Sequence, residues 1–509
     1  MTSAEMNPGD AVLVPSSRQY SQVLAVLALA ATLRLIGLGA NGLWYDEALE
    51  VARDRIPWPR ILLLHEGPDP PLYRVLQSPI AARTTTEAWL RLPSACYSVA
   101  TIWIVWRWIV LLGDPSLALL TALLLAISPL QVYYAQEVSQ YALSGLMGAW
   151  VLLASQKVTD RGLTRDWLAL SAALILAICT YYGLVFLIAG VDIVLLLHMV
   201  RERKTRAWWF FIGINLGLLA AAFLLYALMF AQQQEKFTAG LYPWLGKYTL
   251  EQSLGYVATK LEEDLLRYFW LPWSKGLSRA LFLLPLSLLI VGAIGVWRRG
   301  WRWRAPVLIF TLVLAWMCLA DGLGLYPFVF RYAFFLSPLF FLFIAGGLLA
   351  SMRAPMLGIP LAVLVVVAQL VFLPNLGLIP SPWLSPPYEN LERALNWVEM
   401  RSRKGDSIYL YYGAAPAFRI YRSQTQLPVV QGMAFRHLPP EQKVASIETS
   451  MRGRQRFFLV MSHIWESERE TLVAGLNSRG YRLVDSVDAV GAFAGLLEER
   501  RSDVGAGDD

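Results

Sequence analysis

Residues 42–73 read GLWYDEALEVARDRIPWPRILLLHEGPDPPLY and follow directly on the first long apolar run of the chain, at residues 21–38. The stretch begins with an acidic pair, Asp46 and Glu47, and ends with a second polar cluster beside two consecutive prolines. Polar side chains just beyond an apolar run of this length lie close to the lipid headgroups of a membrane. The stretch therefore has the features of an active site held at a membrane surface.

The composition of the chain is that of a polytopic membrane protein. Of its 509 residues, 56% are hydrophobic and 16% are charged, whereas soluble proteins carry about 25% charged residues. Apolar runs long enough to cross a bilayer, which needs about 20 residues, are found at 21–38, 95–112, 117–134, 140–156, 166–180, 182–200, 207–230, 280–297, 305–320, 330–350 and 355–373. We predict a mainly α-helical membrane domain over residues 21–375, with about eleven transmembrane helices.

Positively charged side chains predict the orientation of the chain in the membrane. Lys and Arg gather at residues 157–165, 201–206 and 298–304, whereas the connections at 135–139 and 321–329 contain none. Because positive residues stay on the cytoplasmic side, we predict a cytoplasmic tail at residues 1–20, followed by an uncleaved first span in a bacterial inner membrane. The predicted outer regions are the loops at 41–90 and 231–278 and the chain after about residue 375.

Charge and cysteine usage exclude two classes of function. The net charge of +7 comes mostly from the predicted inner loops, where it sets topology, so we expect membrane lipids and no nucleic acid as partners. The three cysteines, Cys96, Cys179 and Cys318, fall in or beside predicted spans and form no C-x-x-C pair. They define neither a disulfide framework nor a zinc site.

A second domain is predicted after a Pro-rich linker at residues 376–388. Residues 389–401 and 466–478 read as helices, and 407–412 and 456–461 read as strands. We therefore predict an extracytoplasmic α/β domain over residues 389–509. The chain contains no G-x-G-x-x-G motif at a strand–helix junction, so no nucleotide cofactor is expected.

The acidic pair after the first span is a candidate for acid–base chemistry. A carboxylate at position 46 can take a proton from an acceptor hydroxyl that lies within hydrogen-bond reach. The alternative is that Asp46 and Glu47 are simply solvated loop residues.

A second candidate cluster consists of His65, Glu66, Asp69 and Tyr73, on either side of the two prolines. Consecutive prolines stiffen the backbone, so that the neighbouring side chains keep a fixed direction. Carboxylates of Asp46, Glu66 and Asp69 are candidate ligands for a divalent cation. A single His without metal-ligand spacing is a weak signal, and the sequence also allows a site without metal.

Two further polar groups are predicted at the same outer face. Glu137, Gln140 and Tyr141 end a polar and aromatic run, and Arg331 begins the tenth predicted span, where it is suited to bind a phosphate. An interfacial aromatic belt explains the tyrosines but not Glu137 and Gln140, and a lone Arg can also extend to the interface. The loop at 231–278 mixes Trp, Lys and Arg, which suits either a cover over a lipid phosphate or an amphipathic segment on the membrane.

Five short motifs together resemble the bacterial integral-membrane GT-C glycosyltransferases, above all the family 39 protein-mannosyltransferase-like and aminoarabinose-transferase-like enzymes. The motifs are RLIGL at 34–38, LWYDEA at 43–48, PPLY at 70–73, RLPS at 91–94, and Glu137 with YAL at 141–143. The resemblance implies an inverting transfer of a sugar from a polyprenyl-phosphate donor to a lipid, protein or glycan acceptor at the outer membrane face. It also implies that Asp46 is the general base.

Further roles follow from the same resemblance. Glu47, Glu66 and Glu137 are expected to shape acceptor or cation binding, and Arg331 with His65 to lie near the donor phosphate. Two positions depart from the family pattern, because Asp69 replaces a His or Lys before the prolines and Ser139 replaces an Arg. The alternative interpretation is therefore a non-catalytic protein of the same fold that serves as a subunit or scaffold of a membrane complex. A transporter fits less well, since polar groups concentrate at the outer face and not at the bilayer midplane.

Overall fold

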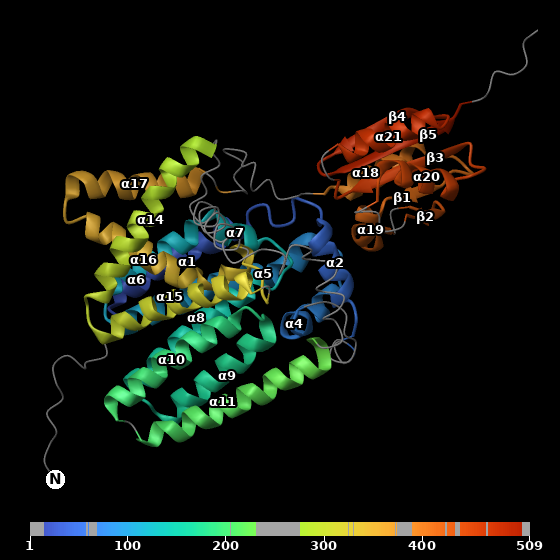
Figure 1. Ribbon diagram of the computed structural model, residues 1–509. Helices are drawn as coiled ribbons and strands as arrows, with labels where there is room; N and C mark the ends of the chain where they lie inside the picture. The colour runs from blue at the N-terminus through green and yellow to red at the C-terminus, as the bar shows by residue number, and fades with distance from the viewer. Residues whose placement is uncertain are drawn as a thin grey trace, which may run out of the picture. The chain divides into compact units, whose positions relative to one another are not determined.

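The computed structural model describes residues 15–57, 60, 69–203, 205–230, 275–323, 325–328, 330–371, 373, 389–422, 425–432, 438–464 and 467–500. The chain divides into two compact units (Figure 1). The first, which we call the helical unit, contains Met1–Ile36, Pro57–Ser78 and Arg91–Leu384. The second, which we call the sheet unit, contains Gly37–Ile56, Pro79–Leu90 and Ser385–Asp509.

Helices make up the first unit, as the apolar runs predict. They are α1 (Ser17–Leu35), α4 (Leu72–Ala81), α5 (Glu87–Leu112), α6 (Pro115–Ile127), α7 (Pro129–Ala135), α8 (Tyr141–Asp160), α9 (Thr164–Thr180), α10 (Leu184–Glu202), α11 (Thr205–Leu225), η1 (Tyr226–Phe230), α14 (Lys275–Trp297), α15 (Trp301–Gly322), η2 (Phe330–Leu336), α16 (Ser337–Ser351) and α17 (Pro355–Val371). Residues 79–81 of α4 and 87–90 of α5 belong to the sheet unit. Among the described residues, five helices are long and apolar enough to cross a membrane, or six if α6 and α7 form one bent span. The mainly helical fold is confirmed, and the count of about eleven spans stays a prediction.

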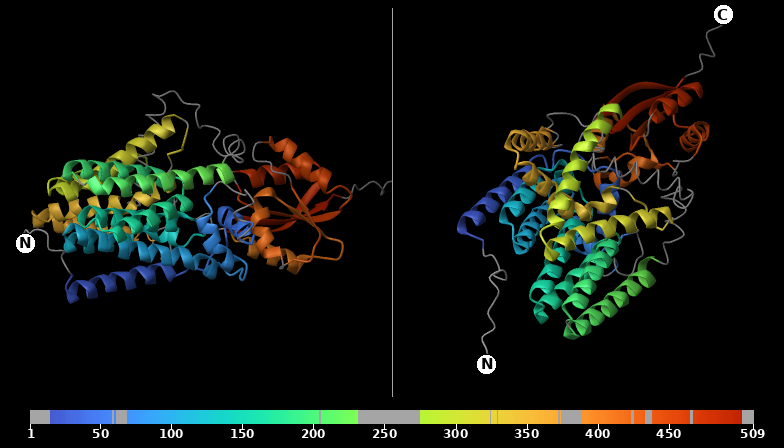
Figure 2. Two further views of the ribbon diagram at one scale, coloured as in Figure 1. Left: turned by 90° about the horizontal axis from the view of Figure 1, so that it is seen from below. Right: turned by 60° about the vertical axis from the view of Figure 1, so that its left-hand side comes forward.

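The helices differ widely in how much of their surface other helices cover. In the span formed by η2 and α16, 89% of the apolar window is buried, because α6, α8 and α14 pack around it. In the span that begins with α11 only 6% is buried, although α11 contacts α9 and α10 in the row of helices that Figure 2 shows. The span formed by η2 and α16 is therefore the centre of the unit, whereas α11 exposes an apolar surface that is suited to contact with lipid.

A buried arginine holds the bend between α6 and α7, whose axes differ by 60°. Pro129 lacks the N–H that would bond to the carbonyl of Leu125 in a continuous helix. The Arg34 guanidinium replaces this donor, with Nη2 3.1 Å from the Leu125 oxygen and Nη1 2.9 Å from the Ala126 oxygen. The RLIGL motif thus contributes a structural residue that satisfies the end of α6.

The sheet unit contains a five-stranded sheet with the strand order β2-β1-β3-β5-β4. The strands are β1 (Ile408–Leu410), β2 (Val429–Gln431), β3 (Arg456–Ser462), β4 (Tyr481–Ala489) and β5 (Ala492–Glu499). The helices are α2 (Tyr45–Asp54), α18 (Leu391–Arg401), η3 (Tyr412–Ala414), α19 (Ala415–Tyr421), α20 (Pro440–Ser450) and α21 (Glu468–Ser478). Strand β1 is parallel to β2 and β3, and β5 is antiparallel to β3 and β4.

Alternate side chains of β3 face helices on the two sides of this sheet. Phe457, Leu459 and Met461 join a core with residues of α20 and α21, whereas Phe458 packs edge-to-face on Trp397 of α18, with ring centroids 6.0 Å apart. The result is a three-layer α/β/α arrangement, which Figure 1 shows. The predicted helices at 389–401 and 466–478 and strands at 407–412 and 456–461 correspond to α18, α21, β1 and β3. That this region lies outside the membrane stays a prediction.

The segment after α1 differs from its prediction as a loop. Residues 45–54 form the helix α2, which packs against α19. Val51 and Ala48 are fully buried on the packed side, so a short apolar stripe within a polar sequence is enough to form this helix once a partner covers it. Residues 37–56 and 79–90 consequently cluster with the sheet unit, whereas the predicted boundaries assigned the whole of 41–90 to the membrane domain.

Candidate functional site

The helix α4 buries polar side chains and exposes apolar ones. Tyr73, Arg74 and Gln77 are each at most 3% exposed, whereas Leu76 is 43% exposed. The helix begins directly after the two prolines, and the N–H of Val75 donates to the Pro71 oxygen at 3.0 Å. The diproline thus fixes the start of a helix, and this helix turns a polar face into the protein.

Tyrosines from four parts of the helical unit form a connected group, which we call the tyrosine cluster: Tyr134, Tyr141, Tyr181, Tyr326 and Tyr332. Ring centroids lie 5.0 Å apart for Tyr134 and Tyr141, and 6.1 Å apart for Tyr141 and Tyr181. The Tyr326 hydroxyl donates to the Tyr181 hydroxyl at 3.0 Å. The cluster therefore joins residues beside α7, α8, α10 and η2, and it presents several hydroxyl groups in one region.

Charged side chains surround this cluster. Asp69, Glu137 and Arg331 all lie within electrostatic reach of the Tyr141 hydroxyl, and the Arg331 guanidinium carbon lies 5.3 Å from the centroid of the Tyr332 ring. The structure thus brings together four of the side chains predicted from sequence: Asp69, Glu137, Tyr141 and Arg331. Gln140 is also buried, in the turn that precedes α8.

The loop between α9 and α10 shows the same charged surroundings. Burial and, to a lesser extent, the Asp69 carboxylate raise the pKa of Tyr182 to about 12, although the Arg74 guanidinium acts in the opposite direction. Burial, followed by the neighbouring tyrosines and Asp69, also raises the pKa of Tyr181. Both phenols therefore stay neutral at physiological pH, where they can donate hydrogen bonds to an anion.

Arg74 is a residue that the sequence motifs did not single out. The motif PPLY ends at Tyr73, and Arg74 follows it on the buried face of α4. The signal in the sequence is that YRVLQS places its polar residues on one helical face, which is unusual beside a membrane span. Arg74 lies within electrostatic reach of Tyr182, which follows the cluster residue Tyr181. With Arg331, it gives the helical unit two guanidinium groups beside phenols, and such groups bind phosphate through paired N–H donors.

The acidic pair lies in the first turn of α2. Glu47 is buried and accepts a hydrogen bond from the backbone N–H of Trp44 at 3.4 Å, whereas Asp46 is partly exposed. The N-terminal turn of a helix carries partial positive charge that stabilises carboxylates. The geometry therefore gives Glu47 a role in starting the helix and leaves Asp46 accessible on one side.

The predicted metal site is not assembled from the described residues. No group of three His, Cys, Asp or Glu side chains in the described part of the chain could hold a metal ion. Asp46 belongs to the sheet unit and Asp69 to the helical unit, while His65 and Glu66 lie outside the described residues. The Pro-rich linker and most of the loop at 231–278 lie outside them as well.

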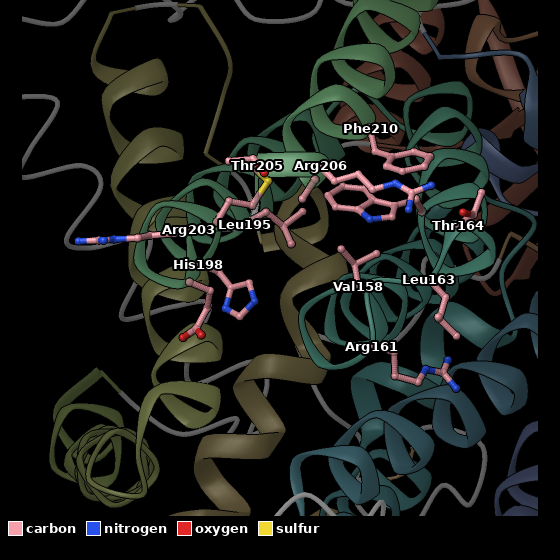
Figure 3. A pocket seen from close by; sticks show the side chains of 15 residues that line it. Val158, Arg161, Leu163, Thr164, Leu195, His198, Arg203, Thr205, Arg206 and Phe210 are labelled. Atoms are coloured by element: carbon pink, nitrogen blue, oxygen red, sulfur yellow. The ribbon is translucent and has the colours of Figure 1, made fainter. Parts of the chain in front are cut away.

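A cavity of about 460 Å³ lies at the other ends of several of these helices (Figure 3). It is lined by the connections from α8 to α9 and from α10 to α11, with Trp167, Phe210 and Arg206 among its residues. No predicted site residue lines this cavity. It is therefore separate from the tyrosine cluster.

Comparisons with known proteins find a match to one family model and a similarity to one fold. The model of the dolichyl-phosphate-mannose-protein mannosyltransferase family matches residues 69–241, which include Asp69, Tyr73, Arg74, Glu137 and Tyr141. A comparison with curated protein sequences gives no match.

Solved structures with a similar fold cover nearly the whole chain. ArnT from Cupriavidus metallidurans, in the apo state and bound to undecaprenyl phosphate, superimposes with a TM-score of 0.60 and 12% identity over 94% of this chain and 98% of that one. The archaeal oligosaccharyltransferase AglB from Archaeoglobus fulgidus, in complex with an inhibitory peptide and a dolichol-phosphate, gives 0.50 and 12% over 96% of this chain and 75% of that one. Together with the family match, these similarities confirm the resemblance predicted from the sequence motifs.

Proposed function

With the fold of the GT-C glycosyltransferases and the match to a family of dolichyl-phosphate-mannose-dependent enzymes as the premise, we propose that this protein is an inverting glycosyltransferase. It moves a hexose or pentose from a polyprenyl-phosphate donor to a lipid, protein or glycan acceptor, at the outer face of a bacterial inner membrane. Proteins of similar fold have been solved with undecaprenyl phosphate and with a dolichol-phosphate bound, which supports this class of donor.

One observation carries the proposal. Two cations, Arg74 on α4 and Arg331 on η2, lie beside phenol groups of the helical unit. Arg331 lies within electrostatic reach of Tyr141, and Arg74 lies within electrostatic reach of Tyr182. Guanidinium groups bind phosphate through paired N–H donors, so two of them beside phenol groups favour an anionic ligand. A phosphate monoester or diester supplies that charge and accepts hydrogen bonds from guanidinium and phenol groups together.

The reaction needs a base and a stabilised leaving group. The acceptor oxygen forms a bond to the anomeric carbon while the bond from that carbon to the phosphate oxygen breaks. The proton of the acceptor passes to Asp46, and the electron pair of the broken bond leaves with the polyprenyl phosphate. We assign general-base catalysis to Asp46 and stabilisation of the departing phosphate to Arg74 and Arg331.

The remaining predicted residues support these two groups. We assign Glu137, Gln140 and Tyr141 to the contacts that hold the sugar or the acceptor, since they are buried beside the charged groups. A divalent cation bound by Asp46, Glu66 and Asp69 stays part of the proposal as an auxiliary group. No step above depends on that cation.

The test is the substitution Asp46→Asn, which keeps the size of the side chain and removes the base. In cells with matched membrane levels of the wild type or the variant, we expect the lipid-linked sugar to accumulate and one glycoconjugate to disappear. Transfer by the purified variant should fall at least about a hundredfold. Mass spectrometry of glycolipids, glycoproteins and polyprenyl-phosphate sugars identifies donor and acceptor together.

The matched control is Asp488→Asn, which removes a carboxylate of the same unit, on β4, that pairs with Arg469 of α21. It should leave transfer unchanged.

If Asp46→Asn and wild-type cells have identical profiles, Asp46 is not the base, and the non-catalytic subunit becomes the better interpretation. Ser139 and Asp69, which replace cations of the family pattern, are the observations that favour this second function. Stable co-purification with partner subunits would support it.

A further inference from the structure

The helix that carries Asp46 begins without a side-chain cap of the usual kind. Its N-cap residue is Trp44, which supplies no side-chain hydrogen bond to the first turn. The first N–H groups of a helix have no partner within the helix and need an outside acceptor. The position of α2 therefore depends on groups from elsewhere in the chain.

Glu389, immediately before α18, provides such an acceptor. The backbone N–H of Tyr45, the first residue of α2, and the side chains of Ser462 and His463 lie close enough to the Glu389 carboxyl to favour its charged form. The distance from His463 Nδ1 to Glu389 Oε1 is 2.8 Å, and Glu389 is 2% exposed. A carboxylate more than three hundred residues away in sequence thus lies at the start of α2, where negative charge is favoured and acts as an electrostatic cap.

His463 makes a second contact with the same residue. Its ring stacks on the ring of Tyr45, with centroids 4.5 Å apart and planes inclined by 22°. The backbone of His463 has φ +55°, a left-handed conformation that costs free energy for a residue with a side chain and persists only where the surroundings fix it. His463 follows the last residue of β3, and with this backbone conformation its ring lies between Glu389 and Tyr45.

The residues just before α2 are held in a similar way. The N–H of Leu43 donates to the Tyr421 hydroxyl at 3.1 Å, and this hydroxyl donates to Glu87 at 2.5 Å. At Gly42 a Cβ atom would lie 2.7 Å from the carbonyl oxygen of Glu389, so the two segments touch through their backbones. Two contacts therefore fix the residues that lead into α2, one at Gly42 and one at Leu43.

We propose that Glu389 and His463 are positioning residues, which hold α2 and thereby set the place of the Asp46 carboxylate. This inference rests on the proposed function, because it assigns to the C-terminal α/β region a task in the same reaction. Neither residue contacts a reacting atom in this scheme. Their effect passes through the backbone of Tyr45, next to Asp46, since a small displacement of a catalytic group lowers the rate steeply.

The experiment compares full-length variants in the membrane-mimetic state used for the wild type. Glu389→Ala removes the cap, Glu389→Gln keeps an acceptor oxygen, and His463→Asn tolerates the left-handed backbone but cannot stack on Tyr45. The control, Glu448→Gln, breaks an exposed ion pair of the same unit, between Glu448 on α20 and Arg479. Two readouts are taken for each variant: amide hydrogen exchange of residues 45–50, and kcat and KM for sugar transfer.

We expect Glu389→Ala and His463→Asn to raise amide exchange in the first turn of α2 about five- to tenfold, with β1 and β3 unchanged. In both, kcat should fall at least about tenfold while KM for the donor stays constant. Glu389→Gln should show a smaller rise in exchange and a smaller fall in kcat than Glu389→Ala. Glu448→Gln should match the wild type in both. A general loss of folding would instead accelerate exchange in β1 and β3.

Unchanged exchange in α2 for His463→Asn and Glu389→Ala overturns the proposal. If Glu389→Ala does not fold, His463→Asn alone decides it. If exchange rises as expected but the wild type transfers no sugar, the anchoring of α2 stands and the proposed glycosyl transfer fails. If transfer occurs and neither readout changes in the variants, the positioning role fails and the proposed function stands.

Discussion

At the scale of single residues, Arg74 accounts for part of the positive charge that the sequence motifs lack. Asp69 and Ser139 stand where the family pattern has cations, which suggested lost phosphate contacts. The structure places Arg74 on the buried face of α4, near Tyr182. The motifs predicted Asp69, Glu137, Tyr141 and Arg331 as neighbours because each is a recognisable polar residue near a span end. Arg74 was missed because its burial depends on how α4 is rotated.

We expect Arg74→Gln to weaken binding of undecaprenyl phosphate to the purified protein about ten- to a hundredfold. The reason is that a hydrogen bond to a charged group contributes about 1.5–3 kcal/mol. Titration followed by native mass spectrometry measures the change. Arg353→Gln, at an exposed arginine after α16, is the control and should bind like the wild type. Equal affinities for all three proteins would remove Arg74 from the phosphate site.

At the scale of elements, long apolar runs were predicted well and short helices were not. The runs at 182–200 and 305–320 correspond to α10 and α15 within a few residues, because about 20 apolar residues allow little besides a helix in a membrane. The helices α2 and α4 have ten residues each. Helices this short need tertiary contacts, and no local pattern reveals those. The bend at Pro129 also interrupts the run predicted as one span at 117–134.

Close contact between α14 and α16 depends on glycine. A Cβ atom at Gly292 would lie 1.7 Å from the Phe343 oxygen, and one at Gly347 would lie 2.2 Å from the Leu288 oxygen. Small residues at such a crossing let two helix backbones approach in a membrane.

Gly292→Ala should therefore separate the two helices and lower the thermal unfolding midpoint in detergent, at a cost of about 1–3 kcal/mol. Gly295→Ala is a matched control one turn away, where a Cβ atom meets nothing within 4 Å. It should be neutral, or stabilise the helix by about 0.5–1 kcal/mol. Equal midpoints for the two variants would contradict the close packing of α14 on α16.

At the scale of the whole molecule, the grouping of residues 37–56 with the α/β domain could not be predicted from sequence. Leu391, Leu395 and Val398 reveal α18 as an amphipathic helix, and β1 and β3 are apparent from their apolar residues. The contact of Tyr45 with His463 leaves no such local pattern, because it joins residues that are distant in sequence. Sequence thus predicted the two kinds of domain but not which segments each contains.

The same contact makes stability depend on pH. Burial raises the pKa of Glu389, although hydrogen bonds from His463 and the Tyr45 backbone partly oppose this. The folded protein then binds this proton more tightly than the unfolded chain. The stabilisation from this group is therefore complete below the ordinary carboxyl range and is lost as pH rises through the raised folded pKa.

We expect the unfolding midpoint of the wild type, relative to Glu389→Gln, to fall as pH rises from the ordinary carboxyl range through the raised pKa of Glu389. Asp485→Asn serves as a control of opposite sign, because the Arg401 side chain lowers the pKa of Asp485. In this comparison the wild type should lose stability relative to Asp485→Asn as pH falls. A difference between wild type and Glu389→Gln that does not vary with pH would contradict the raised pKa.

The cap of α2 by Glu389 also sets a condition on biosynthesis. The ribosome makes Tyr45 early, and Glu389 and His463 follow more than three hundred residues later, a delay of roughly 20–80 s at about 5–20 residues per second. During that time α2 has neither its acceptor nor its stacking partner. A chain whose translation stops before β3 can still insert its spans, but it lacks the contacts that order the helix carrying Asp46. Completion of the C-terminal sheet thereby becomes the last step in making the candidate catalytic group ready for use.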